Sequence, residues 1–277
     1  MTVKIVTDSA CDLPEALVQE LDISIVSLSV RFGDEEFVDR IDLSVDEFWA
    51  RCHSSDVLPE TAAPSPGAFE TAFREALDGD YDEVVCINLS GDLSATIQAA
   101  DAAAKSMSDA TIEIVDSRTV SMGLGSIVLA AAEAARDGAD AATIAATARD
   151  MASRTRVHAA LDTLENLKKG GRIGGAASLV GSLLSIKPMI EVREGVVEPN
   201  GRQRTRARAL TFLVDTVANA GEIERLCVMH AQCDDLPDFM ERLKGIYDGD
   251  IVVGDIGAII GAHAGTGVIG VTFQVPA

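Results

Sequence analysis

"DEVVCINLSGDLSATIQAADAAAKSMSDATIEIVDS", residues 82–117, contains a strand, a helix and a second strand in direct succession. The runs "DEVVCINLS" and "ATIEIVDS" are short and apolar, as in buried strands. "SATIQAADAAAKSM" between them has the composition of a helix. Two strands joined by a crossover helix pair in parallel, so this stretch predicts an α/β fold.

The same alternation continues on both sides of this unit. Further strands are predicted at 3–10 and 23–32 with a hairpin return at 32–39, and helices at 13–21, 44–52, 67–77 and 121–138. We therefore expect a first domain, residues 1–153, with a mostly parallel sheet and flanking helices. Ligands of such sheets bind beyond the carboxyl ends of the strands.

The pattern changes after residue 153. "KPMIEVREGVVEPNGRQR", residues 187–204, predicts a hairpin, which a sheet built from crossovers does not need. Residues 157–186 are predicted to form a strand, a short helix, a glycine-rich turn and another helix. The other predicted elements are helices at 204–221 and 235–246, a strand at 225–231, and two or three strands within 251–275. Residues 154–277 are expected to form a smaller α+β domain, with the C-terminal segment near the domain junction.

Composition limits the possible functions. The 277 residues carry a net charge of −21, which disfavours nucleic acid and anionic lipid surfaces as partners. The N-terminus has no signal-peptide pattern, and the least polar stretch is interrupted by Glu133 and too short for stable membrane insertion. The five cysteines are odd in number and scattered, without a zinc pattern. We expect a reduced, cytoplasmic protein without a metal or cofactor.

"LKKGGRIGG", residues 167–175, places Lys168, Lys169 and Arg172 among four glycines. A tight turn of this kind, followed by a helix that starts near Gly175, can present N–H groups and cations to a small anion. The alternative is a solvated loop with glycine caps.

Hydroxyl groups follow two of the predicted turns. Thr61 and Ser65 lie in the proline-stiffened loop "ETAAPSPGAF", and Ser94 and Thr96 lie at a strand-to-helix junction. Each group could orient an anionic ligand, and each could equally cap a helix, which is the default role of Ser94.

His263 lies in "GAHAGTG", residues 261–267, where small neighbours permit close approach of a ligand or of another backbone. An imidazole there could donate to a carboxylate or phosphate, or be a satisfied core residue. Asp8, Asp12 and Asp116 could meet above the sheet or act as N-caps. Because no nucleophile has an evident base, the sequence favours binding over catalysis.

The chain resembles the DegV family of fatty-acid-binding proteins from residue 3 to the C-terminus. The matching segments are "DSACDLP", "TAAPSPGAF", "LSATIQAA", "VDSRTVSMGLG", "LENLKKGGRIGGAASLVGSLLSIKPMI" and "GAHAGTGVIGV". The resemblance implies the two-domain DegV-like, or EDD, fold and a long-chain fatty acid in an apolar tunnel. It also implies that the carboxylate is presented to a fatty acid kinase partner, which forms an acyl phosphate for phospholipid synthesis.

By position, the resemblance implies that Thr61 and Ser94 bind the carboxylate. His263, Arg172, Ser65 and Thr96 would lie near the head group. The chain departs from the family pattern at "TAAPS", residues 61–65, and at "LSATIQAA", residues 93–100, where alanines replace polar residues and a glycine. Burial of ~15 methylenes at ~0.8 kcal/mol each exceeds what the hydrogen bonds to the head group contribute. The tunnel should therefore set affinity and the hydroxyls orientation.

Two alternatives remain open. An enzyme could act on a small carbonyl or acyl substrate through His263, because the implied fold resembles the substrate-binding domain of dihydroxyacetone kinases. A regulatory module could instead sense lipid supply. A docking face could include Lys168, Lys169, Arg172, Arg202, Arg204 and Arg206, or these residues could be solubilising charges. The sequence leaves the chain length and unsaturation of the acid, the residues of the tunnel, the oligomeric state and the kinase partner undetermined.

Overall fold

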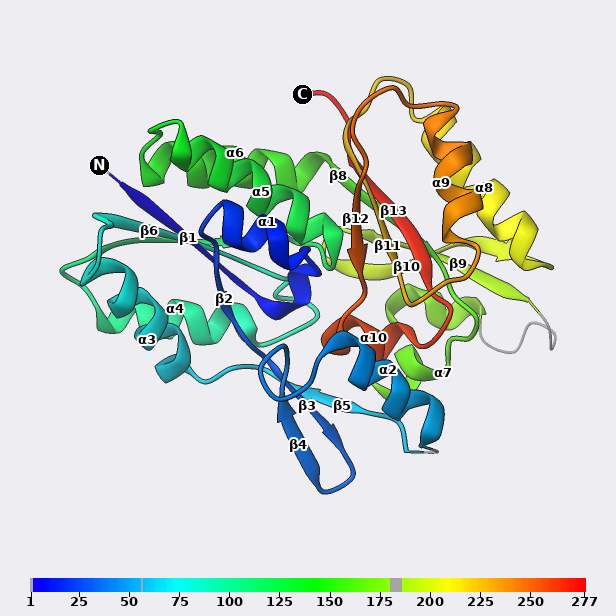
Figure 1. The fold of residues 1–277 in the computed structure, drawn as a ribbon, viewed down its shortest axis with the longest axis horizontal. Helices are drawn as coiled ribbons and strands as arrows, with labels where there is room; N and C mark the ends of the chain where they lie inside the picture. Colours follow the sequence, from blue (N-terminus) through cyan, green and yellow to red (C-terminus); the bar gives the residue numbers. More distant parts are fainter. Residues whose placement is uncertain (1, 56, 180–185) are drawn as a thin grey trace.

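The predicted parallel sheet is present in the first half of the chain (Figure 1). The computed structural model describes residues 2–55, 57–179 and 186–277. The parallel sheet has the order β2-β1-β6-β7, with bounds Ser24–Val26, Val3–Asp8, Glu83–Asn88 and Thr111–Asp116. β1 and β6 are buried along nearly their whole length, because helices cover both faces of the sheet.

The helices lie in two layers, visible below and above the parallel sheet in Figure 1. One layer consists of α3 (Pro66–Leu77) and α4 (Thr96–Ser106), and the other of α1 (Glu15–Glu20), α5 (Met122–Arg136) and α6 (Ala141–Arg154). Phe69 and Phe73 of α3 pack in one apolar cluster with Val84 and Cys86 of β6. The sequence analysis missed α6, whose first turn is capped by the Asp140 side chain.

Residues 23–32, predicted as one strand, form two strands in different sheets. β2 joins the parallel sheet, whereas β3 (Ser29–Phe32) pairs with β4 (Glu35–Val38) and β5 (Glu60–Ala62) in a small antiparallel sheet. The break falls at Leu28, whose N–H donates to the Ser9 hydroxyl and whose carbonyl accepts from Asp39 N–H. Apolar periodicity does not reveal this break, because it does not report which strand is the partner.

The second half of the chain forms a six-stranded sheet, in the order β10-β9-β8-β13-β11-β12. The bounds are Thr155–Ala160 for β8, Lys187–Arg193 for β9, Val196–Gln203 for β10, Glu224–His230 for β11, Val252–Asp255 for β12 and Ile269–Gln274 for β13. Its pairs are antiparallel apart from β11–β12, and the predicted β9–β10 hairpin is confirmed.

Helices cover both faces of the six-stranded sheet. α8 (Arg206–Asn219) and α9 (Leu236–Lys244) pack on one face. α5 packs against the other, so that it lies between the two large sheets. One apolar cluster therefore contains residues of both halves. β8 begins directly after α6, close to the predicted boundary at 153/154, and the division into two domains stays a prediction.

The C-terminal segment differs from the prediction of two or three strands. β12 and β13 are strands, but the small residues between them form a helix, α10 (Ala258–Ala264). Gly261 of α10 has no room for a Cβ, which would lie 2.6 Å from the Phe48 ring and 2.8 Å from the Trp49 ring. Both aromatic residues belong to α2 (Val45–Ser54), so the small residues serve close packing of two helices.

The region after β8 also differs from the sequence prediction. α7 (Glu165–Lys169) confirms the short helix, but the helix expected from Gly175 is a 3₁₀ helix, η2 (Gly174–Leu179). The rest of that expected helix, residues 180–185, lies outside the described residues. Within the described residues, no helix combines the length and apolar composition that a bilayer crossing needs.

Asp12 connects three parts of the fold. It lies in a left-handed conformation after the short 3₁₀ helix η1 (Ser9–Cys11) at the end of β1. Its carboxyl group accepts from the Ser121 hydroxyl at 2.6 Å, before α5, and from Gly257 N–H at 2.9 Å, at the start of α10. Burial raises the pKa of Asp12 to about 7, although both hydrogen bonds oppose this rise.

We expect the stability of the protein to depend on the ionisation of Asp12. Because its pKa is higher in the folded state than the ~4 of an unfolded chain, the protonated group stabilises the fold at low pH. This stabilisation is lost as pH rises through about 7. In the unmodified chain, the free energy of unfolding should fall between pH 5 and pH 8. In Asp12→Asn this fall should be smaller by about 2 kcal/mol, as measured by urea denaturation.

The matched control is Asp34→Asn, which changes an exposed turn residue and should leave the pH profile unaltered. Burial also raises the pKa of Asp8, to about 6, so part of the pH dependence should remain in Asp12→Asn. A profile identical to that of the unmodified chain would contradict this account of Asp12.

Candidate functional site

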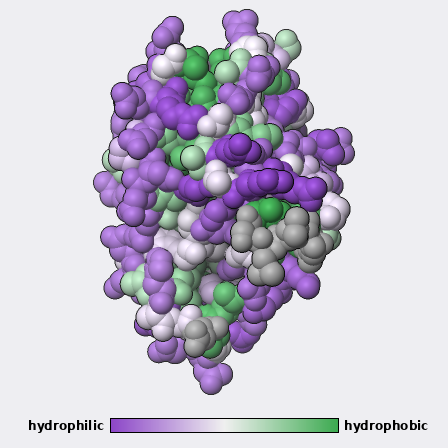
Figure 2. Space-filling model, turned by 90° about the vertical axis from the view of Figure 1, so that its right-hand side faces the viewer, coloured by the Kyte–Doolittle hydropathy of each residue, from purple (hydrophilic) through white to green (hydrophobic). Residues whose placement is uncertain are grey.

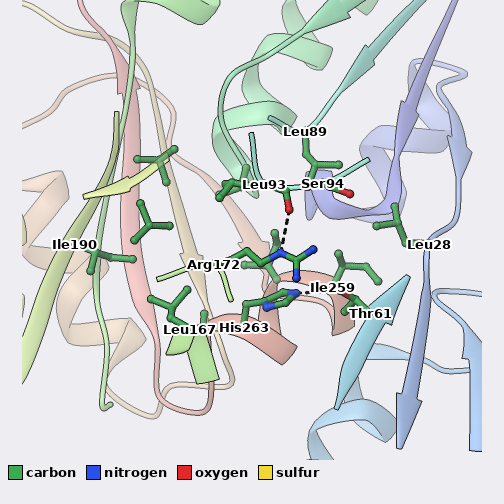
Figure 3. A pocket seen from close by; sticks show the side chains of 15 residues that line it. Leu28, Thr61, Leu89, Leu93, Ser94, Leu167, Arg172, Ile190, Ile259 and His263 are labelled. Carbon is green, nitrogen blue, oxygen red and sulfur yellow. Dashed lines mark hydrogen bonds between the residues drawn. The ribbon is translucent and has the colours of Figure 1, made fainter. Parts of the chain in front are cut away.

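An apolar cavity lies between the two halves of the molecule, beyond the carboxyl ends of β1 and β6 (Figure 3). Its apolar walls come from both halves: Leu28, Leu89, Leu93, Val120, Leu167, Ile190, Val192, Val197, Ile259, Ile260 and Ala264. The lining residues, which the sequence leaves undetermined, therefore come from both halves of the chain. The β9–β10 hairpin contributes Ile190, Val192 and Val197, which the sequence had not indicated as lining residues.

The cavity has a volume of about 90 Å³. An apolar cavity of about 150 Å³ accommodates benzene. Any long apolar ligand therefore requires the lining side chains to move apart, or the hairpin wall to shift. The cavity in this structure is narrow.

Four polar side chains line the same cavity. They are Thr61 of β5, Ser94 of the loop before α4, Arg172 of the turn after α7, and His263 of α10. Figure 3 shows Thr61, Arg172 and His263 close together, and Ser94 near Leu93 on the opposite side of the guanidinium. The tertiary structure thus brings together residues that are 202 positions apart in the case of Thr61 and His263.

Thr61 and His263 form a hydrogen bond, with Oγ1 and Nε2 2.9 Å apart. Burial, together with the positive charge of Arg172, lowers the pKa of His263 to about 4, so the imidazole is neutral near pH 7. Its other nitrogen, Nδ1, is buried and has no hydrogen-bond partner among the described residues. His263 therefore offers one polar atom, Nε2, toward Thr61 and the cavity.

Gly170 leaves the space in which the His263 ring lies. A Cβ on Gly170 would lie 2.8 Å from Cε1 of His263, and closer still to Nδ1. The carbonyl of Gly170 also accepts from Arg172 Nη1 at 2.6 Å. One residue of the "LKKGGRIGG" turn thus determines where two polar side chains of the site lie.

Arg172 is held by the backbone of both halves. Nε donates to the carbonyl of Leu93 at 3.0 Å, and Nη1 donates to Gly170 as described. No described carboxylate pairs with the guanidinium. The half-buried guanidinium of Arg172 has carbonyl partners only, so no described carboxylate offsets its positive charge. Arg172 can therefore attract an anion into the cavity.

The remaining predicted hydroxyls form local hydrogen bonds. Ser94 Oγ lies 2.9 Å from Thr96 Oγ1 and accepts from Thr96 N–H at 3.3 Å, and the residue at the N-cap of α4 is Ala95. Thr96 is fully buried. Ser65 is the N-cap of α3 and accepts from Ala68 N–H, so its side chain lies at that helix and not on the cavity wall.

The three predicted strand-end acids each bind nearby backbone groups. Asp8 accepts from the N–H groups of Ala10 and Leu89, and Asp116 accepts from those of Gly91 and Arg118. Asp12 accepts from Ser121 and Gly257, and none of the three lines the cavity. The described residues contain no group of three or more His, Cys, Asp or Glu side chains placed to hold a metal ion.

A second pocket of about 320 Å³, here called the outer pocket, adjoins the same polar residues. Thr61, Arg172 and His263 line both the outer pocket and the apolar cavity. The outer pocket is otherwise bordered by Leu58, Pro59, Glu60, Asn166, Lys169, Gly170 and Ala262. The three shared side chains therefore form a polar partition between an apolar interior and a polar mouth.

We expect Gly170→Ala to destabilise the protein through His263. The backbone of Gly170 has φ −73°, which alanine adopts freely, so the cost arises from overlap with the imidazole. Overpacking of this kind costs roughly 1–3 kcal/mol. In a double-mutant cycle of unfolding free energies, Gly170→Ala should cost less in a His263→Ala background than in the unmodified chain.

Gly67→Ala is the control, because a Cβ there meets its nearest neighbour, Ser65 Oγ, at an ordinary 3.7 Å. Its effect should be the same in both backgrounds. Equal destabilisation by Gly170→Ala with and without the imidazole would show that Gly170 does not act on His263.

Comparisons with known proteins agree on one family. The family model described as "Uncharacterised protein, DegV family" matches residues 2–275. A DegV domain-containing protein of Clostridium perfringens is 34% identical over 281 residues, covering 99% of each chain. Among solved structures, a fatty-acid-binding DegV family protein from Thermus thermophilus matches with a TM-score of 0.91 and 30% identity, covering 100% of each chain. DegV, a fatty acid binding protein from Bacillus subtilis, matches with a TM-score of 0.87 and 30% identity, also over 100% of each chain. Sequence and fold together place this chain in the DegV family.

Proposed function

We propose that the protein binds a long-chain fatty acid, with the acyl chain in the apolar cavity and the carboxylate at the polar partition. The observation that carries the proposal is one cavity with apolar walls and a polar group of Thr61, Ser94, Arg172 and His263. The fatty-acid-binding structures from Thermus thermophilus and Bacillus subtilis support it.

The head group would be held by donors from both halves. A carboxylate only accepts hydrogen bonds, so the hydroxyls of Thr61 and Ser94 would turn toward it, and Arg172 would supply positive charge. When Nε2 of His263 carries the imidazole proton, Thr61 Oγ1 accepts from it and its own O–H can donate to the carboxylate. A carboxylate close to Nε2 would also favour the imidazolium, and hence raise the pKa of His263 from its low value in this structure.

The acyl chain would enter as the cavity widens. Movement of the β9–β10 hairpin is the simplest route, because Ile190, Val192 and Val197 form one wall. The turn of this hairpin is attached to the parallel-sheet side by the Ser90 hydroxyl, which donates to the Gly195 carbonyl at 2.7 Å. Two elements that meet through few such bonds can separate at low cost.

The proposal includes a kinase partner that phosphorylates the bound carboxylate. The outer pocket supports this role, since it reaches Thr61, Arg172 and His263 from the side opposite the acyl chain. Figure 2 shows a largely hydrophilic surface on the side of the six-stranded sheet, as expected for a face that releases and rebinds a partner. Arg202, Arg204 and Lys168 are exposed and available for docking.

Arg206 is unsuited to the predicted docking face. Its guanidinium makes two hydrogen bonds to Asp235, at 2.8 and 2.9 Å, and a third to the Gly267 carbonyl. This pairing stabilises the start of α8 against the loop before α9. Lys169 also has a partner, Glu165, at 2.9 Å, but that pair is exposed and weak.

In this proposal the chain is a cytoplasmic lipid-binding subunit and has no catalytic activity of its own. The geometry gives His263 a hydroxyl partner, Thr61, and no described carboxylate that would orient it as a base. Turnover of a small carbonyl or acyl substrate by the purified chain alone would instead favour the enzyme hypothesis.

Organic extraction of the purified protein followed by mass spectrometry tests the proposal directly. We expect a long-chain fatty acid at close to one molecule per chain, or uptake of added oleate by delipidated protein. Failure to copurify with or take up any long-chain acid would contradict the proposed function.

Thr61→Ala and Ser94→Ala should each weaken oleate binding roughly 10–100-fold, because each removes one hydrogen bond to a charged group. Binding should persist, since burial of the acyl chain is unaffected. Calorimetric titration of delipidated protein measures the change. Thr71→Ala, which removes an exposed hydroxyl bonded to the Gly67 carbonyl, is the control. Unchanged affinity in both site variants would exclude these hydroxyls from the head-group site.

A further inference from the structure

A further hollow, here called the groove, adjoins β9 of the β9–β10 hairpin. It has a volume of about 610 Å³ and is bordered by the end of β7, the last turns of α6, the start of β8 and the end of β9. The groove is separate from the apolar cavity, but Val192 lines both. The proposed function makes no use of this groove.

Arginine is concentrated in this groove. The chain as a whole has 23 Lys and Arg residues against 44 Asp and Glu residues. The groove is lined by Arg118, Arg149, Arg156 and Arg193, and by the carboxylates Asp116, Glu191 and Glu194. In a protein of net charge −21, a hollow lined by four arginines is less acidic than the chain as a whole and is the more favourable for an anion.

One of the carboxylates in the groove, Asp116, is already hydrogen-bonded to backbone N–H groups. Asp116 accepts from Arg118 N–H at 2.8 Å and from Gly91 N–H at 3.2 Å. Arg156 donates to the carbonyls of Ser153 and Thr155 and forms no ion pair within the described part of the chain. Its guanidinium is therefore oriented by the backbone and keeps an uncompensated charge.

The other three arginines are exposed and have partners. Arg149 pairs with Glu113 at 2.9 Å, and Arg118 pairs with Asp92 at 3.5 Å and donates to the carbonyl of Glu194. Exposed ion pairs of this kind contribute about 0–1 kcal/mol, so an anion can replace them. Arg193, whose side chain is 65% exposed, lies 3.4 Å from Glu191, which is 20% exposed.

The arginines approach the groove from two sides. Arg118 and Arg149 belong to the side of the parallel sheet, and Arg156 and Arg193 belong to the six-stranded sheet. A ligand with two anionic groups could therefore contact both sides at once. Thr119, which also lines the groove, is 3% exposed, and its Oγ1 has no partner among the described residues.

We propose that this groove is a binding site for a small molecule with two phosphate groups. Guanidinium groups present paired N–H donors that match phosphate oxygens. The volume is that of an ordinary small-molecule site. A diphosphate would connect Arg118 on one side with Arg156 and Arg193 on the other, and would hold the hairpin turn against the parallel-sheet side.

Inorganic pyrophosphate is the probe, titrated into the protein at constant ionic strength and followed by calorimetry and by ¹⁵N NMR. We expect saturable binding with shifts at residues around the groove. Arg156→Ala and Arg193→Ala should each reduce the affinity at least about tenfold, because each removes one guanidinium contact. Arg74→Ala, an exposed arginine paired with Glu70 on α3, is the matched control and should leave the affinity unchanged.

Absence of saturable pyrophosphate binding, or equal binding by the groove variants and the control, would overturn the proposal. Citrate binding as tightly as pyrophosphate would overturn its assignment to phosphate. Thermal unfolding of each variant without ligand shows whether it is folded. The substitutions Arg156→Lys and Arg193→Lys keep the positive charge but remove the planar guanidinium with its paired N–H donors. An affinity for pyrophosphate between those of the unmodified chain and the alanine variants would support recognition by guanidinium geometry.

Discussion

The position of the short helix α10 is the constraint on which the site depends. Its N-terminus is held by Asp12, its middle packs against Phe48 and Trp49, and Asn166 donates to the Ala262 carbonyl near its end. The indole of Trp49 also donates to the carbonyl of Ile256, immediately before the helix. Because a helix of seven residues has little stability of its own, these contacts determine where His263 lies.

The location of α10 explains why the polar partition contains residues from distant parts of the chain. Thr61 lies on β5, an edge strand of the small sheet, Arg172 lies in the glycine-rich turn after α7, and His263 lies on α10. Each side chain is oriented mainly by the backbone or by another member of the group. In the proposed function, the apolar walls contribute most of the affinity for the acid, and the polar atoms fix the orientation of its carboxylate.

The charge distribution gives the two hollows different properties. The chain is strongly acidic overall, yet the groove beside the β9–β10 hairpin is lined by arginines from both halves of the chain. Near the apolar cavity, a single guanidinium, that of Arg172, is held by the Leu93 and Gly170 carbonyls. The β9–β10 hairpin borders both hollows through Val192.

The sequence by itself predicted the order of most elements and the hairpin at 187–204. Its resemblance to the DegV family implied Thr61, Ser94, Arg172 and His263 as site residues, and these four line one cavity in the structure. Periodicity and turn residues are local signals, and the motifs that resemble the DegV family are contiguous. Only the tertiary structure decided that residues 23–32 divide between two sheets, that 258–264 is a helix, and that Ser65 caps α3 while Val192 and Val197 line the cavity. Each of these outcomes depends on a partner far away in the chain, such as Phe48 against Gly261, and a local pattern contains no information about that partner.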